Sequence, residues 1–290
     1  MYEYISLHRE KFSVCAMCHT LKVSESGYYR HILHTCQPNH WQLLLAKIRG
    51  IIARYPDNDN YGVKRIRLAL EQDGIIVSKS TVRRTMKKGG LLKKSPRHSC
   101  SLTKADADAQ KVENLIHRDF TAEEPNRKWL TDITQIPCRD GKLYIAPVLD
   151  CYNGEIVGLA MDDNMKKELC IRAFESACKS QSAKGMILHS DRGSQFTSSA
   201  FRDALARHDA IQSMSSTGRC YDNARMESFF ATLKKEKLYK IQTEQMPMAQ
   251  VKSIVFRYIM VYYNRIRIYT GNPGGLPPAM YRQAARGLAA

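Results

Sequence analysis

The chain has 290 residues, enough for one sizeable core with smaller satellite domains, and its 45 Lys and Arg against 28 Asp and Glu give a formal charge of +17. This surplus indicates a polyanionic partner. The polar N-terminus lacks the apolar segment of a signal peptide, and the most apolar stretch, 254–263, is too short to span a membrane and contains Arg257. We therefore expect a cytoplasmic protein without a membrane span.

The positive charge is concentrated toward the N-terminus. Residues 1–104 contain 19 basic and 7 acidic side chains, a net of +12, whereas residues 105–290 contain 26 and 21, a net of +5. The first third is thus expected to bind nucleic acid, and the remainder has room for an acidic site.

Residues 1–40 are predicted to form a segment of helix-turn-helix proportions. Val14, Cys18 and Leu21 share one helical face, and Ser24 can cap a second helix that carries Tyr28 and Ile32.

The cysteines and histidines of this segment allow two metal hypotheses. Cys15, Cys18 and His19 have the spacing of a haem attachment motif, and a zinc site could add the nearby His34, Cys36 and His40. Haem attachment needs an exported chain, and the zinc site lacks a second tight pair. The nine cysteines follow no framework, so we expect reduced thiols and favour Cys15 and Cys18 as small apolar residues of a buried helix.

Residues 41–94 predict a clearer helical module that binds DNA. Apolar stripes indicate helices near 44–51 and 63–70, and Ser78 can cap a third helix that ends before Gly89. The third helix carries five cations, namely Lys79, Arg83, Arg84, Lys87 and Lys88. Such a run of cations usually faces solvent only. Here the short connection from the preceding helix, the cap at Ser78 and the local surplus of positive charge favour DNA contact.

Residues 95–125 predict a linker with at most one short helix, near 105–117. Residues 126–240 predict an α/β core, a mixed sheet with flanking helices. Asp140-Gly141 and Asn153-Gly154 indicate tight turns between three consecutive antiparallel strands. The expected strands are 129–137, 142–150, 155–162, 185–190 and 211–214, the expected helices are 166–180, 198–208 and 222–239, and residues 241–290 are expected to form a helical extension.

Three acidic residues in this core have polar surroundings, and 35 residues separate the last two. Asp132 lies inside the first strand, Asp191 ends a later strand, and Glu227 is expected at the edge of the apolar face of the long helix, away from solvent. Converging carboxylates need a multivalent cation, and their hard oxygens suit Mg²⁺ or Mn²⁺, a pair of which can align attack on a phosphodiester. With 28 acidic residues in the chain, spacing alone favours solvated carboxylates.

Lys234 lies seven residues after Glu227, within about 20° of it around the helix. It is either a surface lysine or a residue that holds a DNA phosphate near the metals.

The sequences around these acids resemble three signature blocks of bacterial insertion-sequence transposases in the retroviral-integrase superfamily. The blocks are Trp129-Leu-Thr-Asp-Ile-Thr134, His189-Ser-Asp-Arg-Gly-Ser-Gln-Phe196 and Tyr221-Asp-Asn-Ala-Arg-Met-Glu-Ser-Phe-Phe-Ala-Thr-Leu-Lys234. More narrowly, the chain is similar to the catalytic reading-frame product of two-frame insertion sequences. Segments 21–29, 61–92 and 262–267, with Pro278 and Tyr281, extend the resemblance over nearly the whole chain.

The resemblance implies a ribonuclease-H-like core in which Asp132, Asp191 and Glu227 bind two Mg²⁺ or Mn²⁺ ions. Water and then a DNA 3′-hydroxyl would attack phosphodiesters, so that element ends are cut and joined to new DNA, usually through a circular intermediate. Residues of the blocks expected to contact DNA are Arg192, Gln195, Asn223 and Lys234.

The partners implied are double-stranded DNA, as inverted-repeat ends and as target, and further copies of the chain in a homo-multimer. The family's catalytic chain usually works fused by frameshift to an upstream reading-frame product. Such a protein is expected to be nucleoid-associated.

One departure from the family pattern lies near the C-terminus. Tyr269 stands where the family commonly has histidine, and an unusual Gly271-Asn-Pro-Gly-Gly-Leu-Pro-Pro278 follows. The position is not a metal ligand in the family, so the chemistry should be retained, and the change concerns C-terminal packing or DNA contact.

Two other functions fit parts of the chain. A DNA-binding regulator would need only the basic N-terminal third. A recombinase with a tyrosine nucleophile is suggested by Tyr262, Tyr263 and Tyr269 beside Arg265 and Arg267, although these tyrosines also fit helical packing. A covalent phosphotyrosine enzyme would not need a metal, so chelation distinguishes the two chemistries.

Overall fold

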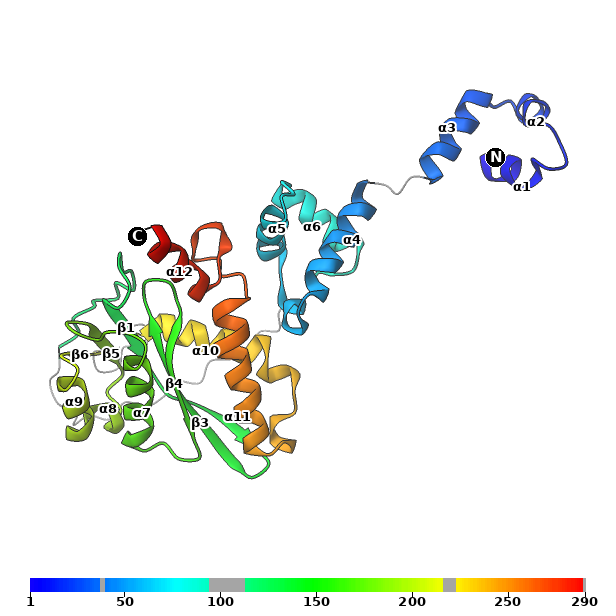
Figure 1. The fold of residues 1–290 in the computed structure, drawn as a ribbon. Coiled ribbons are helices and arrows are strands. Elements are labelled where there is room, and N and C mark those ends of the chain that lie inside the picture. Colours follow the sequence, from blue (N-terminus) through cyan, green and yellow to red (C-terminus); the bar gives the residue numbers. More distant parts are fainter. Residues whose placement is uncertain (37–39, 94–112, 216–222, 289–290) are drawn as a thin grey trace.

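The N-terminal helices form a small unit with its own core. The computed structural model describes residues 1–36, 40–93, 113–215 and 223–288. Helices α1 (Tyr2–His8), α2 (Val14–Thr20) and α3 (Glu25–Cys36) enclose Ile5, Met17, Cys18 and Tyr28, and they lie at one end of the molecule (Figure 1). The predicted cap is confirmed, because the Gly27 N–H donates to Ser24 Oγ at 3.1 Å. Helix α1 was not predicted, since Ile5 is its only buried residue.

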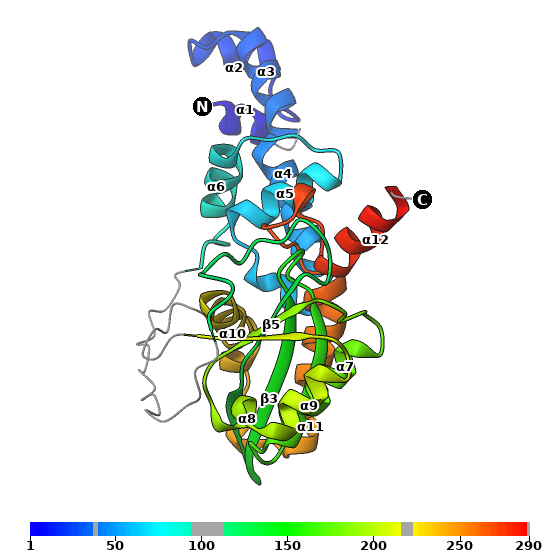
Figure 2. The same ribbon diagram turned by 90° about the vertical axis from the view of Figure 1, so that its left-hand side faces the viewer.

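The second helical module has the predicted three helices. They are α4 (His40–Ala53), α5 (Val63–Gln72) and α6 (Lys79–Lys88), with a 3₁₀ turn η1 (Pro56–Asn60) between the first two. The Thr81 N–H donates to Ser78 Oγ at 3.1 Å, which confirms the N-cap of α6. Buried residues such as Ile48, Ile66 and Val82 form a core that continues into the larger domain below it (Figure 2).

The larger domain is built on a mixed sheet. Its strands are β1 (Lys128–Thr131), β2 (Thr134–Cys138), β3 (Gly141–Asp150), β4 (Ile156–Asp162), β5 (Ile187–Ser190) and β6 (Ile211–Met214). Strand β3 pairs antiparallel with β4 on one side and with β1 and β2 on the other, while β1, β5 and β6 run parallel. The predicted antiparallel strands and their two tight turns are confirmed.

The predicted first strand, 129–137, is interrupted at Asp132. Thr131 lies opposite Val148 and Thr134 opposite Ile145, so the same register places Asp132 opposite Pro147. Pro147 has no N–H to donate to the ladder. The Ile133 N–H instead donates to Asp132 Oδ1 at 2.7 Å. Asp132 therefore lies in a break between β1 and β2, not inside a continuous strand.

Helices cover both faces of the sheet. Trp129 points to the face covered by α7 (Lys167–Cys178), the short α8 (Ser194–Thr197) and α9 (Ser199–Ala206). Leu130, its neighbour, points to the face covered by α10 (Ala224–Glu236) and α11 (Met248–Phe256), as alternation along a strand requires (Figure 1). The fold is thus the predicted ribonuclease-H-like mixed sheet with flanking helices, preceded by helical segments.

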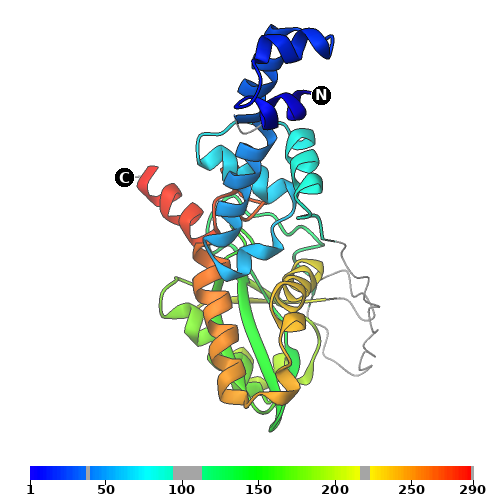
Figure 3. The same cartoon turned by 90° about the vertical axis from the view of Figure 1, so that its right-hand side faces the viewer.

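The C-terminal residues are helical and pack against both other parts. Short 3₁₀ turns η3 (Leu238–Lys240) and η4 (Thr243–Gln245) follow α10, and α11 continues into a π-helical segment, η5 (Arg257–Tyr263), visible as one long helix in Figure 3. The chain then forms η6 (Pro273–Gly275) and α12 (Pro278–Leu288). Within α12, Arg282 is almost fully buried and pairs with Asp150 and Glu155.

Two further expectations concern the linker and the membrane. Of the helix expected near 105–117, residues 105–112 lie outside the described residues. Residues 113–117 form no helix, and Glu113 and Leu115 are hydrogen-bonded to β6. In the part of the chain that the structure describes, no helix is long and apolar enough to cross a membrane.

Candidate catalytic site

Asp132 is a half-buried carboxylate among other charged groups. Burial raises its pKa to about 7, and the negative charges of Asp191 and Glu227 act in the same direction. The Ile133 N–H and the ammonium group of Lys234 oppose this rise. Asp132 therefore lies within electrostatic reach of Asp191, Glu227 and Lys234.

Asp191 follows the last residue of β5, as predicted, and is exposed at the edge of the sheet. Its Oδ1 accepts the Gly193 N–H at 3.0 Å, which lowers the pKa of the carboxyl. Removal of the carboxyl from water by neighbouring protein groups has the larger effect and raises this pKa. His189, two residues earlier, is fully buried, and its ring nitrogens lie 2.9 Å from Ser213 Oγ and 3.1 Å from Ser215 Oγ. This histidine joins β5 to β6 and so fixes the end of the strand that carries Asp191.

Glu227 lies in the first turn of α10. It is exposed, so the prediction that it faces away from solvent is wrong, because its neighbour Met226 and not Glu227 occupies the buried face. Two side chains hold this end of the helix: Asn223 Nδ2 donates to the Thr131 carbonyl at 3.1 Å, and Arg225 Nη1 donates to the Cys151 carbonyl at 2.6 Å. The first of these bonds ties the start of α10 to the residue before Asp132.

The other candidate residues of the core have mainly protein contacts. Asn223 is only 5% exposed, which leaves little of it for the expected DNA contact. Arg192 Nε donates to the Ser215 carbonyl at 2.7 Å, and Gln195 Nε2 donates to the Met165 carbonyl at 3.0 Å. Both therefore brace the loops around Asp191. The sequence could not predict that Asn223 supports the start of α10, because Thr131 is close to it only in the folded chain.

The cations of α6 lie outside this cluster, on the helical module. Lys79, Arg83, Arg84, Lys87 and Lys88 are all exposed, while Val82, Thr85 and Met86 are buried. The ammonium of Lys88 lies 5.1 Å from the centre of the Trp41 ring. The helix thus presents its charge to solvent, as a nucleic-acid-binding helix requires.

The donor set of the cluster fits a divalent cation, although its geometry is not a preformed cage. Hard carboxylate oxygens suit Mg²⁺ or Mn²⁺, and a cation would stabilise the ionised form of Asp132, whose pKa is raised by burial and by the charges of Asp191 and Glu227. Asn223 Oδ1 adds a buried oxygen with no hydrogen-bond partner among the described residues. In the same set of residues, no three His, Cys, Asp or Glu side chains are close enough to hold one ion.

The N-terminal metal hypotheses gain little from the structure. Cys18 is buried in the small N-terminal core, as expected for an apolar residue. The same expectation for Cys15 is wrong, because Cys15 is exposed. The side chains of His34 and Cys36 lie outside the described residues.

The tyrosines considered as nucleophiles are packing residues. Tyr262 and Tyr263 are buried, and their hydroxyls donate to Asn58 Oδ1 at 3.1 Å and to the Gly154 carbonyl at 3.3 Å. Burial raises the pKa of both phenols, which opposes formation of the nucleophilic phenolate. Tyr269 lies against Gly154, where an added Cβ would come within 2.7 Å of its ring, so this departure affects C-terminal packing.

Comparisons with known proteins agree with this architecture. Residues 40–99 match the model of an HTH-like domain, and residues 122–220 and 227–285 match two models of an integrase core domain. The fold and its matches define a protein with an integrase catalytic core behind a helix-turn-helix-like domain.

The relatives narrow this class. The chain is 34% identical over 277 residues to an uncharacterized 31 kDa protein of insertion element IS600 from Shigella sonnei, covering 94% of this chain and 100% of that one. It is 32% identical over 286 residues to the transposase InsF of insertion sequence IS3A from Escherichia coli, covering 97% of each. The chain belongs to this family of IS3-type insertion-sequence transposases.

Among solved structures, the HTLV-2 integrase catalytic core domain in complex with magnesium is similar, with 17% identity and a TM-score of 0.42. The match covers 56% of this chain and 99% of that one.

Proposed function

We propose that this transposase cuts the 3′ ends of its insertion sequence and joins them to target DNA in a reaction that depends on Mg²⁺ or Mn²⁺. The observation that carries the proposal is the match of residues 122–220 and 227–285 to integrase core domains, because these ranges contain Asp132, Asp191 and Glu227. It is supported by the charges of Asp191, Glu227 and Lys234, which act together with burial on the pKa of Asp132. Two bound ions would polarise the scissile phosphate and activate the attacking hydroxyl group.

The chain's own residues have separate tasks in this proposal. Asp132, Asp191 and Glu227 supply the oxygen ligands, while the hydrogen bond from Asn223 to the Thr131 carbonyl keeps the first and last of them on neighbouring elements. Lys234 holds a DNA phosphate beside the acids. Arg192 and Gln195 brace the loop of Asp191, and we propose that both also contact DNA there.

The partners follow from charge and family. The exposed cations of α6 bind double-stranded DNA, chiefly through phosphates, at the element's inverted-repeat ends. Cutting two ends and joining them to one target calls for more than one copy of the chain. We propose a homo-multimer on DNA, assisted by an upstream reading-frame product that is usually fused by frameshift.

The test is a cleavage and strand-transfer assay on duplexes that carry the element's terminal sequences, with the upstream product present. Asp132→Asn and Glu227→Gln should each reduce the rate by at least about a thousandfold, the equivalent of ~4 kcal/mol of transition-state stabilisation, and EDTA should abolish it. Glu175→Gln, which removes an exposed carboxylate paired with Arg207, is the matched control and should keep activity.

Undiminished cleavage by Asp132→Asn or Glu227→Gln would contradict the proposal. Tight DNA binding without cleavage by the wild-type chain, in Mg²⁺ or Mn²⁺ and with the upstream product, would favour the DNA-binding regulator instead.

A further inference from the structure

A buried carboxylate at the end of α10 accepts hydrogen bonds from two residues and forms an ion pair with a third. Arg267 donates to Glu236 through Nε and Nη2, both at 2.8 Å, and the Tyr258 hydroxyl donates at 2.9 Å. Arg65, on α5 of the helical module, lies 2.8 Å from Glu236 Oε1. Burial alone would raise the pKa of Glu236, but Arg267 and Arg65 outweigh it and hold the pKa below its ordinary value.

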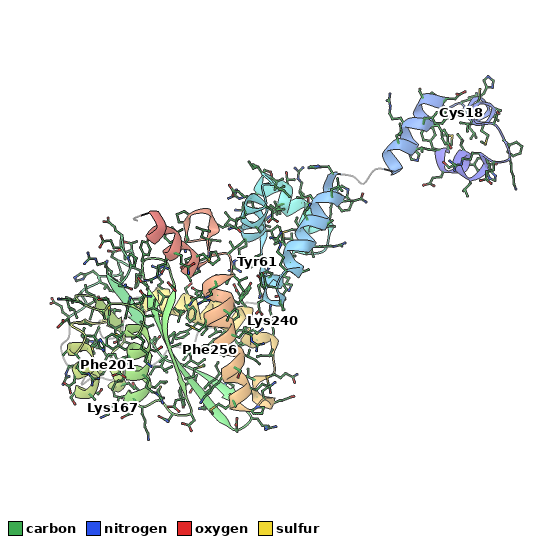
Figure 4. All side chains as sticks on the ribbon, in the orientation of Figure 1. Cys18, Tyr61, Lys167, Phe201, Lys240 and Phe256 are labelled. Atoms are coloured by element: carbon green, nitrogen blue, oxygen red, sulfur yellow. The ribbon has the colours of Figure 1, made fainter. Side chains whose placement is uncertain are left out.

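The same end of α10 is joined to the turn between α4 and α5. Asn60 Nδ2 donates to the Glu236 carbonyl at 2.9 Å, and Lys237 Nζ donates to Asp57 Oδ1, also at 2.9 Å. A third pair, Lys240 with Asp59, extends the contact, and Tyr61 and Lys240 mark its place in Figure 4. The helical module is therefore attached to the helix of Glu227 by several directed bonds, in addition to apolar packing.

Among these contacts, the Arg65–Glu236 ion pair is the one that can be removed without leaving a buried charge unpaired. Arg267 and Tyr258 lie on the same side of the contact as α10 and would still satisfy Glu236 if the module moved away. Arg65 is the cation of the module that pairs with this carboxylate, and its side chain is 19% exposed. Its loss would loosen the module without leaving a buried carboxylate unpaired, a change far milder than removal of Glu236 itself.

Helix α10 transmits the position of this contact to the catalytic residues. Glu236 and Glu227 are nine residues apart on one unbroken helix, about 14 Å along its axis. On the other side of the contact, Arg65 belongs to the module whose third helix, α6, carries the exposed cations. The contact thus helps, together with the shared core, to fix the position of DNA held by α6 relative to Glu227.

We propose that the Arg65–Glu236 pair is a latch that fixes the DNA-binding module relative to the catalytic helix and so determines which phosphodiester is cut. Arg65 is a positioning residue in this scheme. The proposal rests on the proposed function, because it assumes that the acids of the core cut DNA bound by α6.

The experiment compares Arg65→Met with Arg67→Met in the full chain. Arg67 lies on the same helix but pairs with Glu71 on the surface, so its substitution is the matched control. Hydrogen exchange of the free protein reports the latch, and cleavage of a duplex that carries the element's terminal sequence, mapped at nucleotide resolution, reports its consequence.

For Arg65→Met we expect about tenfold faster exchange of amides in residues 56–61, the effect of losing one partly buried ion pair, with the β3 and β5 amides unchanged. Binding to the duplex should stay within about twofold, since the exposed cations of α6 are intact. The cuts should spread from the wild-type phosphodiester to its neighbours. Arg65→Lys should restore most of the wild-type pattern, because it keeps the charge, and Arg67→Met should match wild type throughout.

Two results would overturn the latch. The first is that Arg65→Met shows unchanged amide exchange in residues 56–61 and makes every cut at the wild-type phosphodiester. The second is faster amide exchange throughout the sheet, which would mean general destabilisation. If the wild-type chain cuts no DNA, the proposed function fails, whereas the exchange measurement without DNA still decides whether the latch exists.

Discussion

Replacement of Asp132 by asparagine should stabilise the metal-free protein while it abolishes catalysis. The pKa of this carboxyl is raised from 3.8 to about 7, so the folded chain binds its proton more tightly than the unfolded chain does between these values. The free energy of unfolding therefore falls as the pH rises from about 4 to about 7. A difference of roughly three units corresponds to at most ~4 kcal/mol at neutral pH.

The measured effect should be smaller than this ceiling. Asp132 is half-buried, and solvent screens part of the charge, so we expect Asp132→Asn to be about 1–2 kcal/mol more stable than wild type at pH 7.5 in EDTA. For a chain of this size that is a rise in Tm of roughly 2–8 °C. At pH 5 the difference should shrink, because the wild-type carboxyl is then mostly protonated.

Differential scanning calorimetry at pH 5 and 7.5, with EDTA or with Mg²⁺, provides the measurement. Mg²⁺ should raise the Tm of wild type and have little effect on the variant, since a cation relieves the repulsion that the substitution removes. Asp119→Asn is the control of opposite sign, because the ion pair with Lys128 lowers the pKa of Asp119 and its loss should destabilise the protein at pH 7.5. A variant less stable than wild type at pH 7.5, or equal Mg²⁺ shifts in both, would refute the reasoning.

Three further predictions concern DNA binding and the supports of the site. Replacing Arg83 and Arg84 together by glutamine should weaken DNA binding, measured by fluorescence anisotropy. The slope of log K against log salt should fall by about 0.9 for each phosphate that the chain no longer neutralises, and an unchanged slope would mean that the DNA binds elsewhere. Asn223→Ala should destabilise the chain by about 1–2 kcal/mol and lower kcat more than DNA affinity, because it frees the start of α10. Arg282→Met should cost about 3–5 kcal/mol in chemical denaturation, since it leaves the buried Asp150 without its cationic partner and with two backbone N–H donors alone, and a loss below 1 kcal/mol would contradict this account.

The charge distribution suggests a deletion of residues 1–104 as a test of DNA binding, but the structure indicates that this deletion would also disrupt the larger domain. Removal of residues 1–104 would take away most of the excess positive charge and so test where DNA binds. The helical module, however, shares a core with the larger domain, and its removal would expose apolar residues of that domain such as Tyr262 and Ile268 and leave Lys237 without Asp57. Charge substitutions on α6 test the same point in an intact fold.

Local patterns were enough to predict most of the elements. Alternating apolar residues and the turns at Asp140-Gly141 and Asn153-Gly154 predicted the antiparallel strands, and Ser24 and Ser78 predicted helix starts that the hydrogen bonds confirm. These features depend on neighbours in sequence, which is why they could be recognised. The break at Asp132 could not, because it depends on Pro147 in the partner strand.

By itself, the sequence determined the fold class, the family and the candidate acids, since each rests on residue types and short-range spacing. Only the tertiary structure decided that Glu227 is exposed, that Asn223 supports α10, and that Arg65 and Glu236 join the helical module to the catalytic helix. Arg65 and Glu236 are far apart along the chain, and no local pattern marks such a pair. Their contact exists because packing buries a carboxylate, and a buried carboxylate must be met by donors wherever in the chain they lie.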